Sequence, residues 1–241
     1  MEFIINTDYK YISPYSISML LSFFISFSIS AVILIKENVN KTLSMCSGIL
    51  FTMLSLYFGA VYSFLFYRED KSIGFSSIGG LIGFFIGISV FCIIFKEYRE
   101  RLLKVYTLII PLLYSISKLG CFFAGCCEGI CYDKIFNVIY FGKVAHIVNT
   151  KLFPVQLLES IVFLSIFLFI FYLTCVKKIF YKKAIYFNVT LCSFSKFLLD
   201  FLRNSHEGEV LSINQIACII LFFIMIIFLI KDNKNRLKDE I

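Results

Sequence analysis

Residues 12–35 read ISPYSISMLLSFFISFSISAVILI and contain no charged side chain. A helix of this length can cross a bilayer, because about 20 mostly apolar residues span the hydrocarbon core. Three other runs without charge and three with only one or two charged residues follow it along the chain: 42–67, 72–95, 105–127, 152–176, 184–202 and 210–230. The sequence therefore predicts seven transmembrane helices.

The composition supports the same class of protein. Of the 241 residues, 59% are apolar and only 16% are charged, whereas soluble domains are about 45–50% apolar and ~25% charged. Thirty Phe residues would leave large apolar patches on a soluble protein of this size. These values exclude a soluble enzyme, a disordered chain and a disulfide-rich secreted module. We predict an all-α integral membrane protein that forms a single polytopic domain over residues 1–241.

The connections between the apolar runs predict the orientation. With seven spans, 14 Lys and Arg fall on the side of the C-terminus and 8 on the side of the N-terminus. Positive charge favours the cytoplasm, so we expect the N-terminus outside, the C-terminus in the cytoplasm and a small extracytoplasmic cap between helices 4 and 5. Glu2 and Asp8 replace the basic start of a signal peptide, which predicts a retained first helix. The net charge of +7 comes mostly from Lys and Arg in the connections between the apolar runs, where these residues set the topology. We therefore predict no nucleic-acid partner.

Five charged residues fall in, or at the end of, the outer halves of three predicted spans: Lys118, Glu159, Lys196, Asp200 and Arg203. Charges inside a membrane are costly, and they are a functional hypothesis by default. The last three are four and three residues apart, which places them on one helix face. Two interpretations stay open: ion pairs that hold the helices together, or a polar cavity that binds an anionic headgroup.

Glycines open the third predicted span. Gly79 and Gly80 are followed by Gly83 and Gly87, and small residues at such spacing let two helices pack closely. The alternative is that Gly79 and Gly80 let backbone N–H groups approach a phosphate at a helix N-terminus.

The most specific string is GCFFAGCCEG, residues 120–129, with Cys131 just beyond. Four Cys in eleven residues suggest zinc, but adjacent Cys126 and Cys127 differ from the usual C-x₂₋₄-C pairs. A disulfide is an alternative on an oxidising outer side. We predict no metal ion and no cofactor.

At this string the chain resembles the prolipoprotein diacylglyceryl transferase family, in a branch with a Gly-Cys-Phe-x-x-Gly-Cys-Cys motif. The motifs that carry the resemblance extend along the chain: Tyr15, Lys118–Gly129, Pro154–Glu159, Lys196 with Asp200 and Arg203, and Ser212–Gln215. The chain departs from the family where its His-Gly-Gly motif reads Ile78-Gly79-Gly80, and where Lys118 and Lys196 replace Arg.

The resemblance implies transfer of the diacylglyceryl group of phosphatidylglycerol to the lipobox cysteine of a preprolipoprotein, with a thioether as product and glycerol phosphate as leaving group. It implies a bacterial cytoplasmic membrane protein that meets a preprolipoprotein or another cysteine-bearing peptide. The catalytic candidates are Lys196, Asp200, Arg203 and Glu159; the general base is open among Glu159, Asp200 and His146. The substrate-binding candidates are Tyr15, Gly79, Gly80, Lys118, Cys121, Cys126, Gly129, Gln156 and Gln215.

Two other functions remain compatible with the sequence. In a membrane thiol protein that uses the Cys121–Cys131 cluster, Cys121, Cys126 and Cys127 would exchange disulfides with a partner. In a non-catalytic phospholipid-binding or transport protein, the polar cavity would bind lipid without releasing glycerol phosphate.

Overall fold

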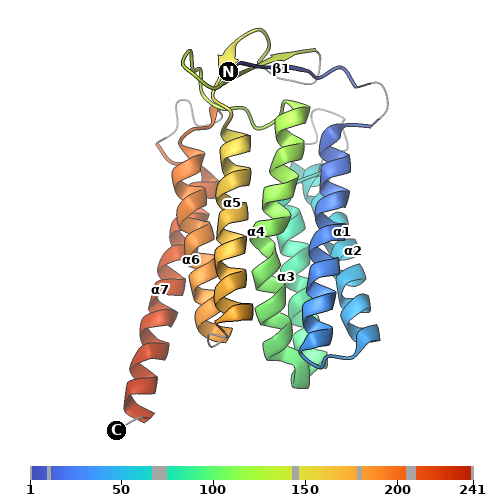
Figure 1. The fold of residues 1–241 in the computed structure, drawn as a ribbon, viewed down its shortest axis with the longest axis vertical. Helices are drawn as coiled ribbons and strands as arrows, with labels where there is room; N and C mark the ends of the chain where they lie inside the picture. The colour runs from blue at the N-terminus through green and yellow to red at the C-terminus, as the bar shows by residue number, and fades with distance from the viewer. Residues whose placement is uncertain are drawn as a thin grey trace. The chain divides into compact units, whose positions relative to one another are not determined.

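The computed structural model describes residues 2–9, 12–66, 75–142, 147–177, 181–204 and 210–239. Seven α-helices lie within these residues, one in each predicted apolar run (Figure 1). They are α1 (Pro14–Lys36), α2 (Lys41–Phe66), α3 (Ser77–Ile94), α4 (Arg99–Ala124), α5 (Val155–Phe171), α6 (Tyr181–Asp200) and α7 (Ile213–Asp239). A 3₁₀ turn, η2 (Lys96–Tyr98), precedes α4, and a π-helical turn, η3 (Tyr172–Val176), extends α5. Each helix overlaps one predicted run, and its ends differ from the predicted bounds by up to nine residues.

Among the described residues, five helical segments are long and apolar enough to cross a membrane: Pro14–Lys36, Lys41–Leu65, Lys96–Ala124, Val155–Val176 and Asn214–Lys231. The apolar part of α3, Gly79–Ile94, is shorter. Helix α6 carries Lys182, Lys183, Lys196 and Asp200, which explains why it does not stand out as apolar.

The chain packs into two compact units, residues 23–109 and residues 1–22 with 110–241. The division falls inside α1 and α4, so each of these helices contributes residues to both units. The units are described separately below.

In the unit of residues 23–109, aromatic rings form the core. Phe51 packs edge-to-face against Phe84, Phe91 and Tyr106, with ring centroids 4.5–5.9 Å apart. Aromatic side chains bury large apolar areas, and edge-to-face pairs add ≈ 0.5–1.5 kcal/mol. The buried Tyr106 hydroxyl shares a hydrogen bond with Ser47, so its polar atom is satisfied inside an apolar unit.

Glycines bring α3 against α2 in the same unit. A Cβ at Gly79 would lie 2.4 Å from the Phe58 carbonyl oxygen, and one at Gly83 would lie 2.3 Å from that of Leu54. The N–H groups of Gly79 and Gly80 already donate to Ser76, at 3.5 and 2.9 Å. These contacts favour helix packing over phosphate binding as the reason for the glycines.

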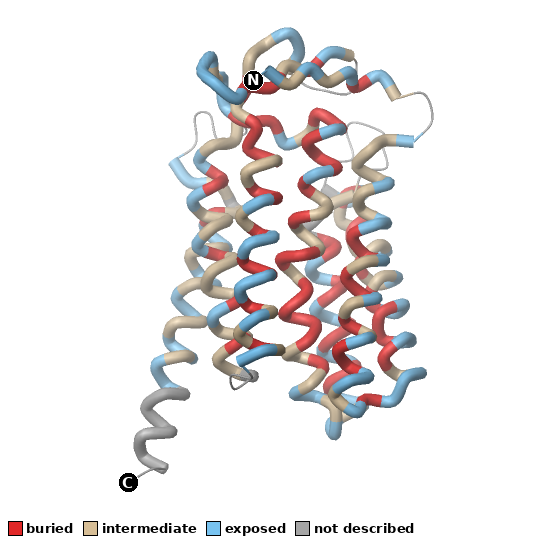
Figure 2. The backbone as a smooth tube through the Cα atoms, viewed as in Figure 1, coloured by how far each residue is buried: buried red, intermediate tan, exposed pale blue. Residues whose placement is uncertain are grey.

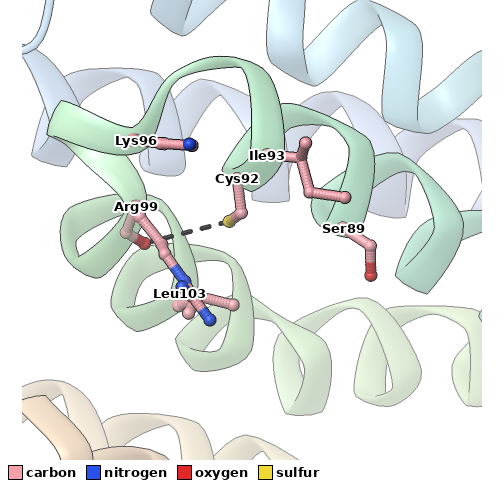
Figure 3. A pocket seen from close by; sticks show the side chains of 6 residues that line it. All are labelled: Ser89, Cys92, Ile93, Lys96, Arg99 and Leu103. Carbon is pink, nitrogen blue, oxygen red and sulfur yellow. Dashed lines mark hydrogen bonds between the residues drawn. The ribbon is translucent and has the colours of Figure 1, made fainter.

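A cavity of about 470 Å³ lies in this unit where α3 ends and α4 begins (Figure 3). Lys96 and Arg99 line it together with Cys92, whose thiol donates to the Arg99 carbonyl oxygen at 3.9 Å. The five predicted intramembrane charges are absent from its lining.

In the other unit, α5 packs against α6 and α6 against α7 (Figure 1). Among the described side chains of α7, only Gln215 is buried, and Figure 2 shows the helix mostly in the colours of exposed and intermediate residues. Phe223, Ile227 and Ile230 are about three-fifths exposed, at 59%, 62% and 59%. Apolar rows of this length are costly in water and are normal on a helix that faces lipid.

A three-stranded sheet covers the end of this unit where α5 begins (Figure 1). Strand β1 (Glu2–Asn6) pairs in parallel with β2 (Asn137–Phe141), which pairs antiparallel with β3 (Lys151–Leu152). The region between helices 4 and 5 was predicted as a small cap, but its strands and the participation of the N-terminus were not predicted.

Apolar side chains attach the sheet to the helices. Val138, Tyr140 and Leu152 are buried with Phe122 of α4, and Phe3, Ile5, Ile147 and Leu157 pack against them. At the surface, Lys151 Nζ lies 3.0 Å from carboxylate oxygens of both Glu2 and Asp133. The hydrogen bond from Lys151 lowers the pKa of Glu2. The stability that this ion pair contributes to the fold is therefore present at neutral pH and is lost as the pH falls through that pKa.

The contact between α2 and α3 gives the first prediction. Gly83→Ala places a Cβ against the Leu54 carbonyl, and we expect overpacking to lower stability by about 1–3 kcal/mol. Thermal unfolding of the detergent-solubilised protein measures the effect. Gly48→Ala is the matched control, because its Cβ would meet only the Phe27 side chain, at 3.3 Å. Equal melting temperatures for the two variants would contradict this packing.

Candidate functional site

The carboxylate of Glu159 lies at the centre of the predicted charge cluster and is fully buried. Its oxygens lie 3.3 Å from Lys118 Nζ, 2.8 Å from Lys196 Nζ and 2.9 Å from Arg203 Nη2. Arg203 Nη2 donates to both oxygens of the carboxylate, each at 2.9 Å. One anion from the first turns of α5 therefore joins cations from α4, from α6 and from the segment after α6.

Asp200 forms a second junction at the end of α6. Its Oδ1 lies 3.1 Å from Lys196 Nζ and 3.5 Å from Arg203 Nε, and its Oδ2 accepts from Ser212 Oγ at 2.6 Å. Lys196 and Asp200 thus pair across one turn of α6, as predicted, whereas Arg203 follows the end of the helix and reaches Asp200 from the next segment. The structure brings together all five charged residues that the sequence singled out.

Gln215 has a local structural role in this arrangement. Its backbone N–H donates to Ser212 Oγ at 3.2 Å, and its Oε1 accepts from the Ser212 N–H at 2.9 Å. This reciprocal pair is a capping box at the start of α7. The Ser-x-x-Gln element therefore places Ser212 beside Asp200; the substrate contact predicted for Gln215 stays a prediction.

Tyr114 belongs to the cluster and was missed by the sequence interpretation. Its hydroxyl donates to Glu159 Oε1 at 3.1 Å, and its ring lies 5.2 Å from Lys118 Nζ and 5.7 Å from Lys196 Nζ. A neutral aromatic residue in an apolar run attracts no notice. The available signal was its position one turn before Lys118, which places both side chains on one face of α4.

Backbone pairing fixes the position of Arg203. Gly129 forms a β-bridge with Arg203, Ile130 N–H donates to the Leu202 carbonyl at 3.1 Å, and Asn204 N–H donates to the Glu128 carbonyl at 3.0 Å. A Cβ at Gly129 would lie 2.2 Å from the Phe153 carbonyl oxygen. Gly129 therefore permits the close approach that holds the segment after α4 against the segment after α6.

Three cysteines converge beside these residues. Cys121, in the last turn of α4, and Cys126 and Cys127, just after it, have sulfur atoms within 4.8 Å of one another. Cys131 is exposed and pairs through its backbone with Leu152. The sequence interpretation named these three as the exchanging cysteines of a possible thiol protein, and the structure brings their sulfur atoms together apart from Cys131.

Gln156 links the cysteine turn to the sheet. Its Nε2 donates to the Cys126 carbonyl at 2.9 Å and lies 3.4 Å from the Tyr140 hydroxyl. Burial raises the pKa of Tyr140, so its hydroxyl stays protonated and donates to the Phe122 carbonyl at 3.0 Å. Gln156 Oε1 is buried without a hydrogen-bond partner within the described part of the chain.

The other predicted site residues are more loosely related to the cluster. Tyr15 lies where α1 packs against Gly120, since a Cβ there would be 3.1 Å from Tyr15 Cα and 2.5 Å from Ser18 Cβ. Gly79 and Gly80 belong to the other compact unit. His146, a candidate base, lies outside the described residues.

The cluster contains more positive than negative charge. Three cations and two carboxylates leave the five-residue network with a net charge of +1, and all five side chains are largely buried. Arg203 Nε is buried and, although it lies 3.5 Å from Asp200 Oδ1, makes no hydrogen bond within the described part of the chain. Buried unsatisfied donors cost ≈ 1–3 kcal/mol, so this arrangement favours an additional anionic acceptor.

Comparison with known proteins agrees with the family resemblance. The profile of the prolipoprotein diacylglyceryl transferase family matches residues 3–231. This chain belongs to that family. Family membership and the five long apolar helices identify a multi-pass membrane protein.

Three relatives are named phosphatidylglycerol–prolipoprotein diacylglyceryl transferase. The protein of Clostridium tetani (strain Massachusetts / E88) is 28% identical over 162 residues, which are 66% of this chain and 63% of the relative. Transferase 2 of Clostridium perfringens (strain 13 / Type A) is 28% identical over 177 residues, 71% of this chain and 66% of the relative. The protein of Campylobacter curvus (strain 525.92) is 29% identical over 168 residues, 66% of this chain and 59% of the relative. The chain thus matches somewhat less than two thirds of the length of each relative.

Removing the central anion tests the cluster. Glu159→Gln leaves three largely buried cations without their shared carboxylate. We expect the free energy of unfolding to fall by about 3–5 kcal/mol. Thermal unfolding in detergent reports the change. Glu97→Gln, at an exposed position of η2, is the control and should leave the melting temperature almost unchanged. Similar behaviour of the two variants would show that Glu159 does not hold the cluster together.

Proposed function

We propose that the protein transfers the diacylglyceryl group of phosphatidylglycerol to the lipobox cysteine of a preprolipoprotein. The products would be a thioether-linked lipid and glycerol phosphate. Family membership and the names of the relatives support this reaction. The observation that carries it here is the buried cationic cluster, with its net charge of +1 and the unsatisfied Nε of Arg203.

The reaction needs positive charge where the phosphate leaves. Donors that are already in place stabilise charge as it develops, because they need no reorganisation during the reaction. In the proposed complex Arg203 Nε donates to a phosphate oxygen, and Lys118 and Lys196 act as point charges beside it. Lys lacks the forked geometry of Arg, so Arg203 supplies the directional contact. Glu159 and Asp200 hold these cations in position.

Both carboxylates of the cluster are poorly suited to act as the general base. Glu159 contacts three cations and the Tyr114 hydroxyl, and Asp200 contacts two cations and the Ser212 hydroxyl. A carboxylate so surrounded gains little from accepting a proton. We therefore assign both a positioning role, which narrows the choice of base that the sequence left open.

An apolar cavity on α6 and α7 offers a place for part of an acyl chain. It has a volume of about 190 Å³, and Phe194, Phe197, Cys218 and Phe222 are among the residues that line it. Phe197 follows Lys196 of the cationic cluster directly in α6. A phospholipid with its phosphate at Arg203 would thus have an apolar surface available on the same helix.

The proposed reaction also sets the topology. We propose seven membrane-spanning helices in the bacterial cytoplasmic membrane, with the N-terminus and the sheet outside and the C-terminus in the cytoplasm. The distribution of Lys and Arg supports this orientation. The cationic cluster would then lie in the outer half of the membrane, where it can meet an exported peptide.

Chemical labelling of Cys131 can test this topology, because its side chain is exposed. A membrane-impermeant thiol reagent applied to intact cells under reducing conditions should label the wild type more than Cys131→Ser. The difference between the two proteins assigns the label to this position. A difference that emerges only after cell lysis would place the sheet in the cytoplasm and contradict the proposal.

One assay separates the proposed reaction from its competitors. Purified protein is incubated with phosphatidylglycerol vesicles and a lipobox peptide, and glycerol phosphate release and peptide mass are both measured. A transferase gives both signals. A lipid-binding protein gives neither, and a thiol protein forms mixed disulfides with the peptide, a function that the convergence of Cys121, Cys126 and Cys127 also favours.

Arg203 provides the sharpest mutational test. Arg203→Ala should lower the transfer rate at least ~10²-fold, because one directed donor to the developing charge is lost. Arg203→Lys should retain part of the activity, since a point charge remains while the directed geometry is lost. Arg101→Ala, in the other compact unit, serves as the control. Full transfer by a folded Arg203→Ala protein would remove the cationic cluster from the mechanism.

A further inference from the structure

The turn after α4 brings together cysteines that the linear sequence separates. Gly125 adopts a left-handed conformation with φ 70°, and the Cys126 N–H donates to the Cys121 carbonyl at 3.2 Å. This is the hydrogen bond of a Schellman cap, which reverses the chain at the end of a helix. The reversal returns Cys126 and Cys127 to the level of Cys121, so that the three sulfurs lie within 4.8 Å of one another.

Cys127 occupies an unfavourable backbone conformation in this turn. Its φ is 57°, and left-handed conformations of non-glycine residues are uncommon and cost roughly 1–2 kcal/mol. Such strain persists where the surrounding structure has a use for it, often at a ligand site. Asn or Gly would relieve the strain. The presence of Cys at this position therefore indicates that its sulfur atom has a role.

Space filling does not account for the three thiols. Cysteine is a useful small apolar residue in a core, but only Cys121 is buried, while Cys126 is partly buried and Cys127 is exposed. A single disulfide would use two of the three sulfurs and leave the third. An arrangement in which all three converge is better explained by one shared ligand.

We propose that Cys121, Cys126 and Cys127 bind a thiophilic divalent metal ion of the zinc class. Zinc–sulfur bonds of ≈ 2.3 Å in tetrahedral geometry place sulfurs about 3.8 Å apart, so sulfurs within 4.8 Å need to approach by at most about an ångström. Three protein ligands with one open position are typical of catalytic zinc sites. The objection from the sequence, that Cys126 and Cys127 are adjacent, loses its force because the turn makes them converge.

The neighbouring charges fit this metal site. A divalent ion with three thiolates carries a net charge of −1, and the five-residue network beside it carries +1. Lys118 and Arg203 both interact electrostatically with Cys127. The cationic network thus lies beside a negatively charged metal site, which lowers the cost of burying either one, while Arg203 Nε keeps its unused donor for the phosphate.

A metal held by these cysteines would keep one position open, which offers an alternative to His146, the candidate base that remains; this step rests on the proposed function. The acceptor cysteine binds there as its thiolate, and its proton passes to water, because metal binding displaces protons from thiols. The acceptor sulfur attacks the glyceryl carbon attached to the phosphate oxygen, so a C–S bond forms as the C–O bond breaks. The electron pair of that bond leaves with glycerol phosphate, whose new negative charge faces Arg203.

Metal content tests the site independently of transfer. The full chain is purified in detergent under reducing conditions from zinc-supplemented cells, and its metal is measured by mass spectrometry. We expect about one zinc ion per chain for a single site. Cys121→Ser and Cys127→Ser should lose most of it, whereas Cys131→Ser should keep it, because Cys131 lies outside the group of three. Thermal unfolding identifies variants that fail to fold.

Cobalt replaces zinc for a second measurement that does not depend on the serine variants. Wild-type protein loaded with Co²⁺ should show thiolate-to-cobalt charge-transfer absorption. A lipobox peptide should alter this absorption, and the same peptide with Ser in place of Cys should not. These changes locate the acceptor thiol at the metal.

The outcomes distinguish the two proposals. Wild-type protein that takes up neither zinc nor cobalt, a native disulfide among the three cysteines, or full metal content in folded Cys127→Ser would overturn the metal site. Unimpaired transfer by metal-free protein would leave the transferase proposal standing and remove the metal from it. Metal binding without glycerol phosphate release would establish the site and overturn the transferase proposal.

Discussion

A single buried carboxylate organises the functional end of this protein. Glu159 joins cations from α4, from α6 and from the segment after α6, with the Tyr114 hydroxyl as a further donor. Burial of one such charge alone would cost several kcal/mol. Each cation therefore needs the carboxylate, and the helices that carry them must meet at this depth.

The neighbouring backbone turns this cluster into a site. Gly129 pairs with Arg203, and the Ser212–Gln215 capping box presents a hydroxyl to Asp200. Main-chain hydrogen bonds and helix caps are less adaptable than long side chains. Arg203 is thus held in place at both its backbone and its guanidinium group, which suits the phosphate contact without reorganisation that we propose for it.

The cysteine turn and the cationic cluster form one electrostatic system. The residues of the turn follow α4 directly, and Gln156 and Gly129 connect them to α5 and to Arg203. Soft sulfur atoms and cationic donors lie beside one another there, since Lys118 and Arg203 both interact electrostatically with Cys127. This combination suits the proposed reaction, in which a thiolate attacks and a phosphate leaves.

The sequence by itself determined the seven helices and the five charged residues, because long apolar runs and charges within them are local properties of the chain. It also supplied the family resemblance. Only the tertiary structure decided the three-stranded sheet, since β1 and β2 are more than 130 residues apart, and the place of Tyr114, which has no charge to mark it. The grouping of Cys121, Cys126 and Cys127 without Cys131 depends on left-handed backbone angles at Gly125 and Cys127, which residue spacing does not reveal.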